Sequence, residues 1–200
     1  TSAGMQQFKS YFLGKADPMK DFGSKNVASI QKSFRTSDID EVGDETHLTF
    51  FEMMGNFSFG GYGIKEAQEL AHEFITQQIG LEINYVSELE EDKNSPDYEY
   101  IIESVSDSTA AWKQHVSDIR YSGRADNFWG PTGSEGPCGP TTEIYVKNIA
   151  KKPIEVWNLV FNEFYCTKDK KLEPLEIKGV DTGMGMERLL AVVNNVADVF

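Results

Sequence analysis

The sequence has few cysteines and histidines and no long apolar run. Two cysteines, Cys138 and Cys166, and three histidines occur among 200 residues, which is too few for a disulfide framework or a zinc site. No apolar stretch approaches the roughly 20 residues that cross a bilayer, and no signal peptide is visible. We therefore expect a soluble domain of the reducing, cytoplasmic compartment that holds no zinc.

Positive charge is also scarce. Nineteen lysines and arginines face 32 acidic residues, so the net charge is -13. Because cationic side chains supply most nonspecific affinity for nucleic acid, this balance excludes a broad electrostatic RNA surface and leaves only local RNA contacts. Much of the excess acid lies in residues 87–97, which we expect to form a solvated loop without a catalytic role.

The remaining composition is that of a globular domain. Hydrophobic residues make up 40% of the chain and aromatic residues 12%, enough to bury a core in a chain of this length. The sequence has no internal repeat, no low-complexity segment and no linker composition that would divide it. We expect residues 1–200 to form a single domain.

Local patterns predict a mixture of strands and helices. Residues 29–35 and 48–55 read as two strands joined by a polar connection, which predicts a long antiparallel hairpin. Apolar residues from Lys65 onward fall at helical spacing as far as a stop at Gly80, which predicts a helix on one face of a sheet. We expect a short strand over 83–86 and a second helix from Asp107 or Ser108 to His115.

Two features of the second half stand out. Residues 126–140 are rich in glycine and proline, which predicts a loop leading into a strand over 142–146. Residues 154–165 are apolar on both alternating faces, which is typical of a central strand buried on both sides. Asn158 and Asn162 are anomalous there, because an unpaired buried amide costs about 1–3 kcal/mol. Each amide is either a satisfied core residue or part of a binding site.

The stretch 180–189 places two glycines between an acid and a base. Asp181 suits an amine and Arg188 suits a phosphate, while Gly183 and Gly185 permit backbone angles closed to other residues. We expect a strand to turn sharply here into a helix that begins near Met186, whose free N–H groups face an anion.

Several motifs occur together in one order along the chain. They are residues 3–9, 49–60, 127–129 with 136–140, 156–161 and 180–189. In this combination the chain resembles the catalytic core of the alanyl-tRNA synthetase family. The resemblance implies an α+β fold of the class II synthetase type, an antiparallel β-sheet flanked by helices. The hairpin after Arg35 is then its motif 2 and the Gly183 turn its motif 3.

The resemblance also implies an activity. Family members activate L-alanine with ATP and Mg²⁺ to alanyl-adenylate and then transfer alanine to the 3′ end of tRNA(Ala). In-line attack on the α-phosphate needs positioning and charge neutralisation more than a protein nucleophile. The expected catalytic residues are Arg35 and Arg188, and no protein ligand for the metal is assigned.

The resemblance assigns residues to the nucleotide. Arg35 matches an arginine on the α-phosphate, His47 a phosphate contact and Phe51 a ring that stacks on adenine. Arg188 matches an arginine that packs on the nucleotide, and Gly185 a backbone contact. Phe50 should face the opposite way.

Other residues are assigned to the amino acid and its surroundings. Asp181 matches the carboxylate that holds the alanine ammonium, Asn158 the amide that reads its carboxylate, and Trp129 a wall of the alanine pocket beside the nucleotide. Val156 and Trp157 flank the same site next to ATP. Trp157 is equally well explained as a core residue.

The chain departs from the family pattern in three places. The loop after Arg35 is short and lacks a lysine, and Glu45 and Thr46 precede His47 where relatives often carry basic residues. The motif 1 region is expected before Thr1, and the tRNA-recognition, editing and C-terminal domains after Phe200. Two alternatives stay open. One is a noncatalytic paralogue that keeps the fold as a binding module. The other is a generic nucleotide-binding protein, which does not explain Asn158 and lacks a P-loop lysine.

Overall fold

A computed structural model of the chain describes residues 1–37 and 39–200. Asp38, in the polar connection of the expected hairpin, lies outside the described residues. The elements follow in the order η1 (Gly4–Phe8), α1 (Lys9–Phe12), α2 (Pro18–Phe22), β1 (Asn26–Phe34), η2 (Ile39–Glu41), β2 (Phe50–Phe59), α3 (Ile64–Glu73), η3 (Phe74–Ile79), β3 (Ile83–Leu89), α4 (Tyr98–Trp112), β4 (Ile119–Ser122), α5 (Arg124–Asn127), β5 (Phe128–Trp129), β6 (Gly136–Lys147), β7 (Pro153–Cys166), β8 (Leu172–Gly185) and α6 (Met186–Val193).

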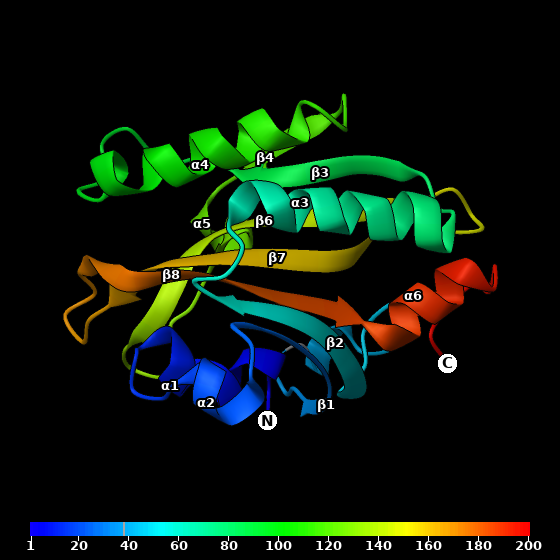
Figure 1. Cartoon of the computed structure of the whole chain (residues 1–200). Helices are drawn as coiled ribbons and strands as arrows, with labels where there is room; N and C mark the ends of the chain where they lie inside the picture. The colour runs from blue at the N-terminus through cyan, green and yellow to red at the C-terminus, as the bar shows by residue number, and fades with distance from the viewer. Residues whose placement is uncertain (38) are drawn as a thin grey trace.

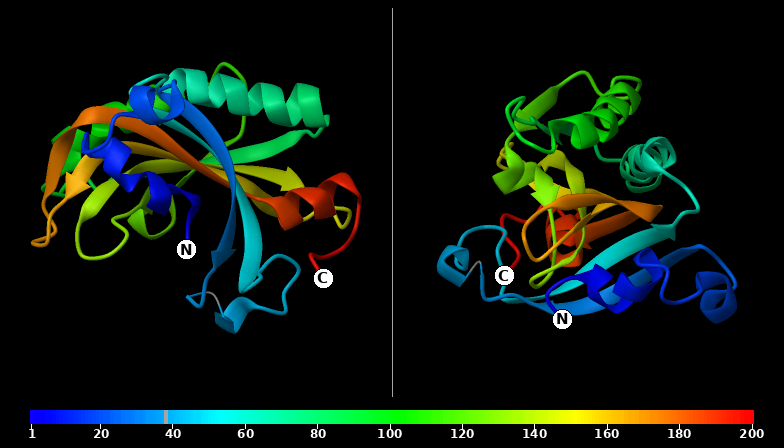
Figure 2. Two further views of the ribbon diagram at one scale, coloured as in Figure 1. Left: turned by 60° about the horizontal axis from the view of Figure 1, so that its bottom comes forward. Right: turned by 90° about the vertical axis from the view of Figure 1, so that its left-hand side faces the viewer.

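One large sheet organises the chain (Figure 1). Its strand order is β1-β2-β8-β7-β6-β3-β4, and β5 pairs with β6. Every pairing is antiparallel except that of β3 with β4. The sheet is strongly twisted, and the β1–β2 hairpin runs out beyond the neighbouring strands (Figure 2). The expected α+β class with an antiparallel sheet and flanking helices is confirmed.

Alternation along the central strands divides the side chains between two faces of the sheet. Trp157, Leu159 and Phe161 of β7 join the main core beneath α3 and α4, which lie side by side over this face (Figure 1). The opposite face carries an aromatic cluster in which the Phe8 and Phe57 rings pack at a tilt of 48° with their centroids 4.5 Å apart. No helix of the described residues is long and apolar enough to span a membrane.

The hairpin, the α3 helix and the central strand are where the sequence predicts them. The helix that starts at Ile64 continues into a single π-helical turn, η3, and ends at Gly80, which adopts a φ of 81°. That left-handed angle favours glycine and explains the stop.

The acidic stretch 87–97 is only partly a loop, and this corrects the expectation. Ser87, Glu88 and Leu89 belong to β3 and are buried, and burial raises the pKa of Glu88 to about 8. Glu91 is also buried, and its carboxylate pairs with the Arg124 guanidinium at 2.6 Å. Satisfied acids can therefore occupy positions that composition alone assigns to solvent.

Two boundaries also differ. α4 begins at Tyr98, about three turns before the expected start, because Ile101 and Val105 pack inward while Glu103 between them is exposed to solvent. The glycine- and proline-rich stretch becomes strand at Gly136 rather than at residue 142. At Gly139 a Cβ would lie 1.7 Å from the carbonyl oxygen of Phe161. Only glycine therefore lets β6 approach β7 so closely.

Candidate active site

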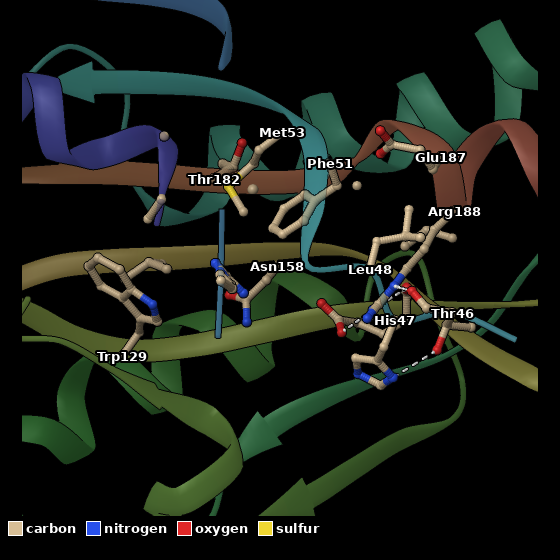
Figure 3. A pocket seen from close by; sticks show the side chains of 18 of the residues that line it. Thr46, His47, Leu48, Phe51, Met53, Trp129, Asn158, Thr182, Glu187 and Arg188 are labelled. Atoms are coloured by element: carbon tan, nitrogen blue, oxygen red, sulfur yellow. Dashed lines mark hydrogen bonds and ion pairs between the residues drawn. The ribbon is translucent and has the colours of Figure 1, made fainter. Parts of the chain in front are cut away.

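A cleft opens on the face of the sheet opposite α3 and α4, between the β1–β2 hairpin and β6–β8 (Figure 3). The cleft is open to solvent, and the empty space between its walls and at its mouth is about 900 Å³. Nine of the ten residues expected in the site line it. They are Arg35, His47, Phe51, Trp129, Val156, Asn158, Asp181, Gly185 and Arg188.

Asp181 provides a buried acid at one end of the cleft. It lies on β8, opposite Val160 of β7 and Phe57 of β2, and is 5% exposed. Burial raises the pKa of its carboxyl to about 7, against the opposing influence of the Arg35 guanidinium. Within residues 1–37 and 39–200 no hydrogen bond to this carboxyl is formed, so its oxygens are available to a cationic ligand. Trp129 lines the same cleft (Figure 3).

Asn158 lies in the floor of the cleft, opposite Gly183 of β8 and Glu143 of β6. Its Nδ2 donates to Glu143 Oε1 at 3.2 Å, and its Oδ1 is buried without a partner among the described residues. The amide is therefore held by a carboxylate that the sequence reasoning did not single out.

Arg35 follows directly after β1 and is half-buried. Its Nε donates to the carbonyl oxygen of Ser2 at 2.7 Å. Its guanidinium carbon lies 5.4 Å from the centroid of the Phe51 ring, within cation–π range. The N-terminal segment and the hairpin thus hold one cation over the middle of the cleft.

Arg188 lies in the first turn of α6 and closes the other end of the cleft (Figure 3). Its Nη1 donates to Glu155 Oε2 at 2.8 Å and to the Glu155 carbonyl oxygen at 3.2 Å, and its Nε donates to the Thr46 carbonyl oxygen at 3.0 Å. These contacts join α6, β7 and the end of the hairpin loop through a single side chain.

His47 is already engaged by carboxylates of its own loop. Its Nδ1 donates to Asp44 Oδ2 at 2.6 Å, and its Nε2 lies 3.1 Å from Glu41 Oε2. Burial alone would raise the pKa of Asp44, but hydrogen bonds from the Thr46 backbone and from His47 outweigh it and lower the pKa to about 2. A phosphate at His47 would have to compete with these two acids.

The model of the family described as tRNA synthetases class II (A) matches residues 1–200. The chain belongs to this family. Among curated relatives, the alanine–tRNA ligase of Rubrobacter xylanophilus is 41% identical over 225 residues, and the match covers 100% of this chain and 24% of that protein. The alanine–tRNA ligase of Dehalococcoides mccartyi is 40% identical, with 100% and 23% covered. The chain therefore spans about a quarter of the length of these relatives.

Solved class II synthetase structures share the fold. A threonyl-tRNA synthetase structure from Cryptosporidium parvum, described as its RNA-binding domain, superposes with a TM-score of 0.62 at 14% identity. It covers 94% of this chain and 48% of that one. Apo histidyl-tRNA synthetase from S. aureus superposes with a TM-score of 0.55 at 13% identity, over 97% and 52% of the two chains.

The glycines of this class II chain do not act as the sequence suggests. Neither Gly183 nor Gly185 adopts a positive φ, and β8 runs directly into α6. At Gly183 a Cβ would lie 2.9 Å from the Met53 sulfur. Gly183 therefore allows close packing of β2 on β8. The expected passage from strand to helix near Met186 is confirmed, but neither glycine uses a positive φ to make it.

Trp157 lies on the wrong face of the sheet for the role that the resemblance implied. Its ring is 8% exposed and packs edge-on against Phe74 with the ring centroids 5.6 Å apart. Since Asn158 points into the cleft, its neighbour in the strand must point into the core. The core reading of Trp157 is correct.

Asn162 is fully buried on the cleft side of β7, and neither of its amide atoms has a partner among the described residues.

Sequence reasoning missed several residues that line or support the cleft in this class II chain. Glu155 pairs with Arg188, Glu187 Oε1 accepts the Glu52 backbone N–H at 2.9 Å, and Met53 lines the wall. Glu155 and Glu187 each adjoin a residue that was predicted. Glu143 belongs to none of the recognised motifs. Only its position opposite Asn158 in the pairing of β6 with β7 shows that it supports the site.

Proposed function

We propose that this chain is the adenylate-forming core of an alanine–tRNA ligase. The observation that carries the proposal is that one cleft holds a buried acid, Asp181, beside the cation Arg35, with the aromatic ring of Phe51 and a second cation, Arg188, further along. The names of the relatives support the choice of alanine. The two free cysteines, both buried, fit a reducing compartment, and we assign the reaction to the cytoplasm.

In this proposal the Asp181 end of the cleft binds L-alanine. The ionised carboxylate of Asp181 pairs with the ammonium group, a charge-assisted hydrogen bond worth about 1.5–3 kcal/mol. The Asn158 amide donates to the alanine carboxylate. Trp129 and Val156 bound the space beside the methyl group, so a small side chain is preferred. Since one methylene changes binding by only about 1–3 kcal/mol, this selection is modest.

ATP occupies the rest of the cleft in the proposal. The Phe51 ring stacks on adenine, Arg188 packs on the nucleotide from the opposite side, and the Gly185 backbone approaches it closely. Among the described residues no group of three His, Cys, Asp or Glu side chains is placed to hold a metal ion. We propose no protein ligand for the magnesium that enters with ATP as substrate.

The proposed chemistry needs no protein nucleophile. An oxygen of the alanine carboxylate attacks the α-phosphorus, the bond to the bridging oxygen breaks, and pyrophosphate leaves. Arg35 neutralises charge that builds on the α-phosphate oxygens in this step. The 3′-terminal hydroxyl of tRNA then attacks the alanyl carbonyl carbon, AMP leaves, and the hydroxyl proton is released. With a net charge of -13, RNA contacts are confined to local sites.

The proposal is tested by exchange of labelled pyrophosphate into ATP. Exchange should occur with alanine and fall to background without it. Asp181→Asn should raise the KM for alanine at least about tenfold, because it removes the charge that pairs with the ammonium group, and should change the KM for ATP by less than about twofold. Asp169→Asn, in the exposed turn between β7 and β8, is the matched control and should behave as wild type.

Two outcomes would contradict the proposal. Alanine-independent exchange, or equal use of several amino acids, would remove the assigned substrate. Binding of a nonhydrolysable alanyl-adenylate analogue in calorimetry without any exchange would instead indicate the noncatalytic binding module.

A further inference from the structure

Glu143 is a carboxylate that contacts Asn158 of the cleft without lining the cleft itself, and the proposed chemistry does not use it. Its Oε1 accepts Asn158 Nδ2 at 3.2 Å across the β6–β7 ladder. Asn158 Oδ1 is inaccessible to solvent and unpartnered among the described residues. The nitrogen is therefore the polar atom of the Asn158 side chain that can reach a ligand, and one of its two N–H groups is taken by Glu143.

Glu143 is itself held in place from several sides. Its Oε2 accepts the Ser87 hydroxyl at 3.0 Å and the Tyr145 hydroxyl at 2.8 Å. Asn127, which is fully buried, donates its Nδ2 to Ser87 Oγ at 2.8 Å. These donors come from β3, β6 and α5, so the carboxylate cannot swing away from Asn158 without breaking a buried network.

We propose that Glu143 is a positioning residue for alanine recognition. By accepting one N–H of Asn158 it fixes the amide so that the second N–H faces the alanine carboxylate. Without that acceptor the amide rotates freely by half a turn about its last torsion and presents an oxygen, which repels a carboxylate. The inference rests on the proposed function, because it names the group that orients one of its binding residues.

The charged groups around Glu143 influence its protonation state, and this state bears on how Glu143 holds Asn158. Burial and the neighbouring Glu155 raise the pKa of Glu143 to about 6, and Asp126 acts in the same direction. The other titratable groups facing it are Tyr145 and, on β3, Tyr85. A protonated Glu143 keeps one carbonyl oxygen that can accept from Asn158, as a glutamine would. Its protonation should therefore weaken alanine use by no more than about threefold.

The test compares two substitutions by alanine-dependent pyrophosphate exchange. Glu143→Met keeps the length of the side chain but removes the acceptor, and should raise the KM for alanine about tenfold with less than about a twofold change for ATP. Glu143→Gln retains an oxygen for Asn158 and should recover to within about threefold of wild type.

A double-mutant cycle separates positioning from a general structural role. In an Asn158→Ala background, Glu143→Met should add less than about a twofold effect, because its partner is gone. Glu163→Gln is the control: this buried carboxylate on the same sheet binds Ser104 and Lys178 away from the cleft, and its loss should leave the KM for alanine unchanged.

Three results would overturn the inference while the proposed function stands. They are an unchanged KM for alanine in Glu143→Met, a Glu143→Gln variant as impaired as Glu143→Met, or additive effects in the cycle. Absence of alanine-dependent exchange in wild type would instead overturn the proposed function, and this inference with it.

Discussion

The buried acid at the end of the cleft makes a prediction about stability as well as binding. The pKa of Asp181 is about 7, against an ordinary value of 3.8. Because this pKa is raised in the folded state, the folded chain binds a proton more tightly than the unfolded chain between these two values. The free energy of unfolding should therefore fall as pH rises from about 4 to about 7 and level off above that range.

The size of the effect follows from the shift. A difference of about 3 units corresponds to about 4 kcal/mol at full ionisation, at 1.36 kcal/mol per unit. Between pH 5 and pH 8 the same two pKa values give a loss in the free energy of unfolding of about 2–3 kcal/mol. Asp181→Asn cannot ionise at this position, so it should lack this loss and be the more stable protein at pH 8.

Urea unfolding of wild type and Asp181→Asn at pH 5 and pH 8 measures the loss in the free energy of unfolding between these two pH values. The difference between the two proteins at each pH cancels the titration of groups that both share, including Glu143 and Glu88. A loss in wild type that equals the loss in Asp181→Asn would refute the assignment of a raised pKa to this buried carboxyl.

Alanine binding should depend on the same protonation of Asp181 in the opposite direction: the affinity should fall as the pH is lowered, whereas the stability should rise. The ammonium group pairs only with the ionised carboxylate, so affinity for alanine should fall about tenfold for each pH unit below 7. Calorimetry at pH 6 in two buffers of different ionisation enthalpy should then show nearly one proton released for each alanine bound. Binding at pH 6 without proton release would show that Asp181 is not the partner of the ammonium group.

Two further predictions test the nucleotide end of the cleft and the sheet beneath it. Phe51→Ala should raise the KM for ATP about tenfold through loss of stacking, whereas Phe50→Ala, on the opposite face of β2 and 57% exposed, should leave it unchanged; equal effects would place adenine elsewhere. Gly139→Ala should lower the free energy of unfolding by about 4 kcal/mol or more, because its Cβ would overlap the Phe161 carbonyl oxygen. Gly123→Ala, where nothing lies within 4 Å, should change it little in the same denaturation assay.

The fold could be predicted where local pattern and tertiary environment agree. The hairpin around β1 and β2, the α3 helix and the buried strand β7 each have a periodicity that their surroundings reinforce. The α4 helix was foreseen only in its second half, because its first turns lie next to an acidic run that composition assigns to solvent. Glu88 and Glu91 become buried through partners such as Ser108 and Arg124, which lie 20 and 33 residues away.

The site residues also divide into those that local sequence motifs predict and those that depend on partners elsewhere in the chain. The residues predicted for the site lie together in the cleft, except Trp157, whose direction depends on the phase of the strand. Glu143 and Glu155 were missed because their importance comes from pairing across the sheet, and no single segment of sequence records that pairing. The two glycines were recognised correctly as unusual, but the reason for Gly183 is the nearby Met53 sulfur and not a strained backbone angle.

The register of the central strands ties the cleft to the core on the other side. Asn158 lies opposite Gly183, and Val160 lies opposite Asp181, so the spacing between the two groups proposed to hold alanine is set by the pairing of β7 with β8. A slip of β7 by one residue would send Asn158 into the core and bring Trp157 into the cleft. Trp157, Leu159 and Phe161 oppose that slip, because their apolar surface is buried only in the observed register. Trp157 thus supports the proposed alanine site from the opposite face of the sheet.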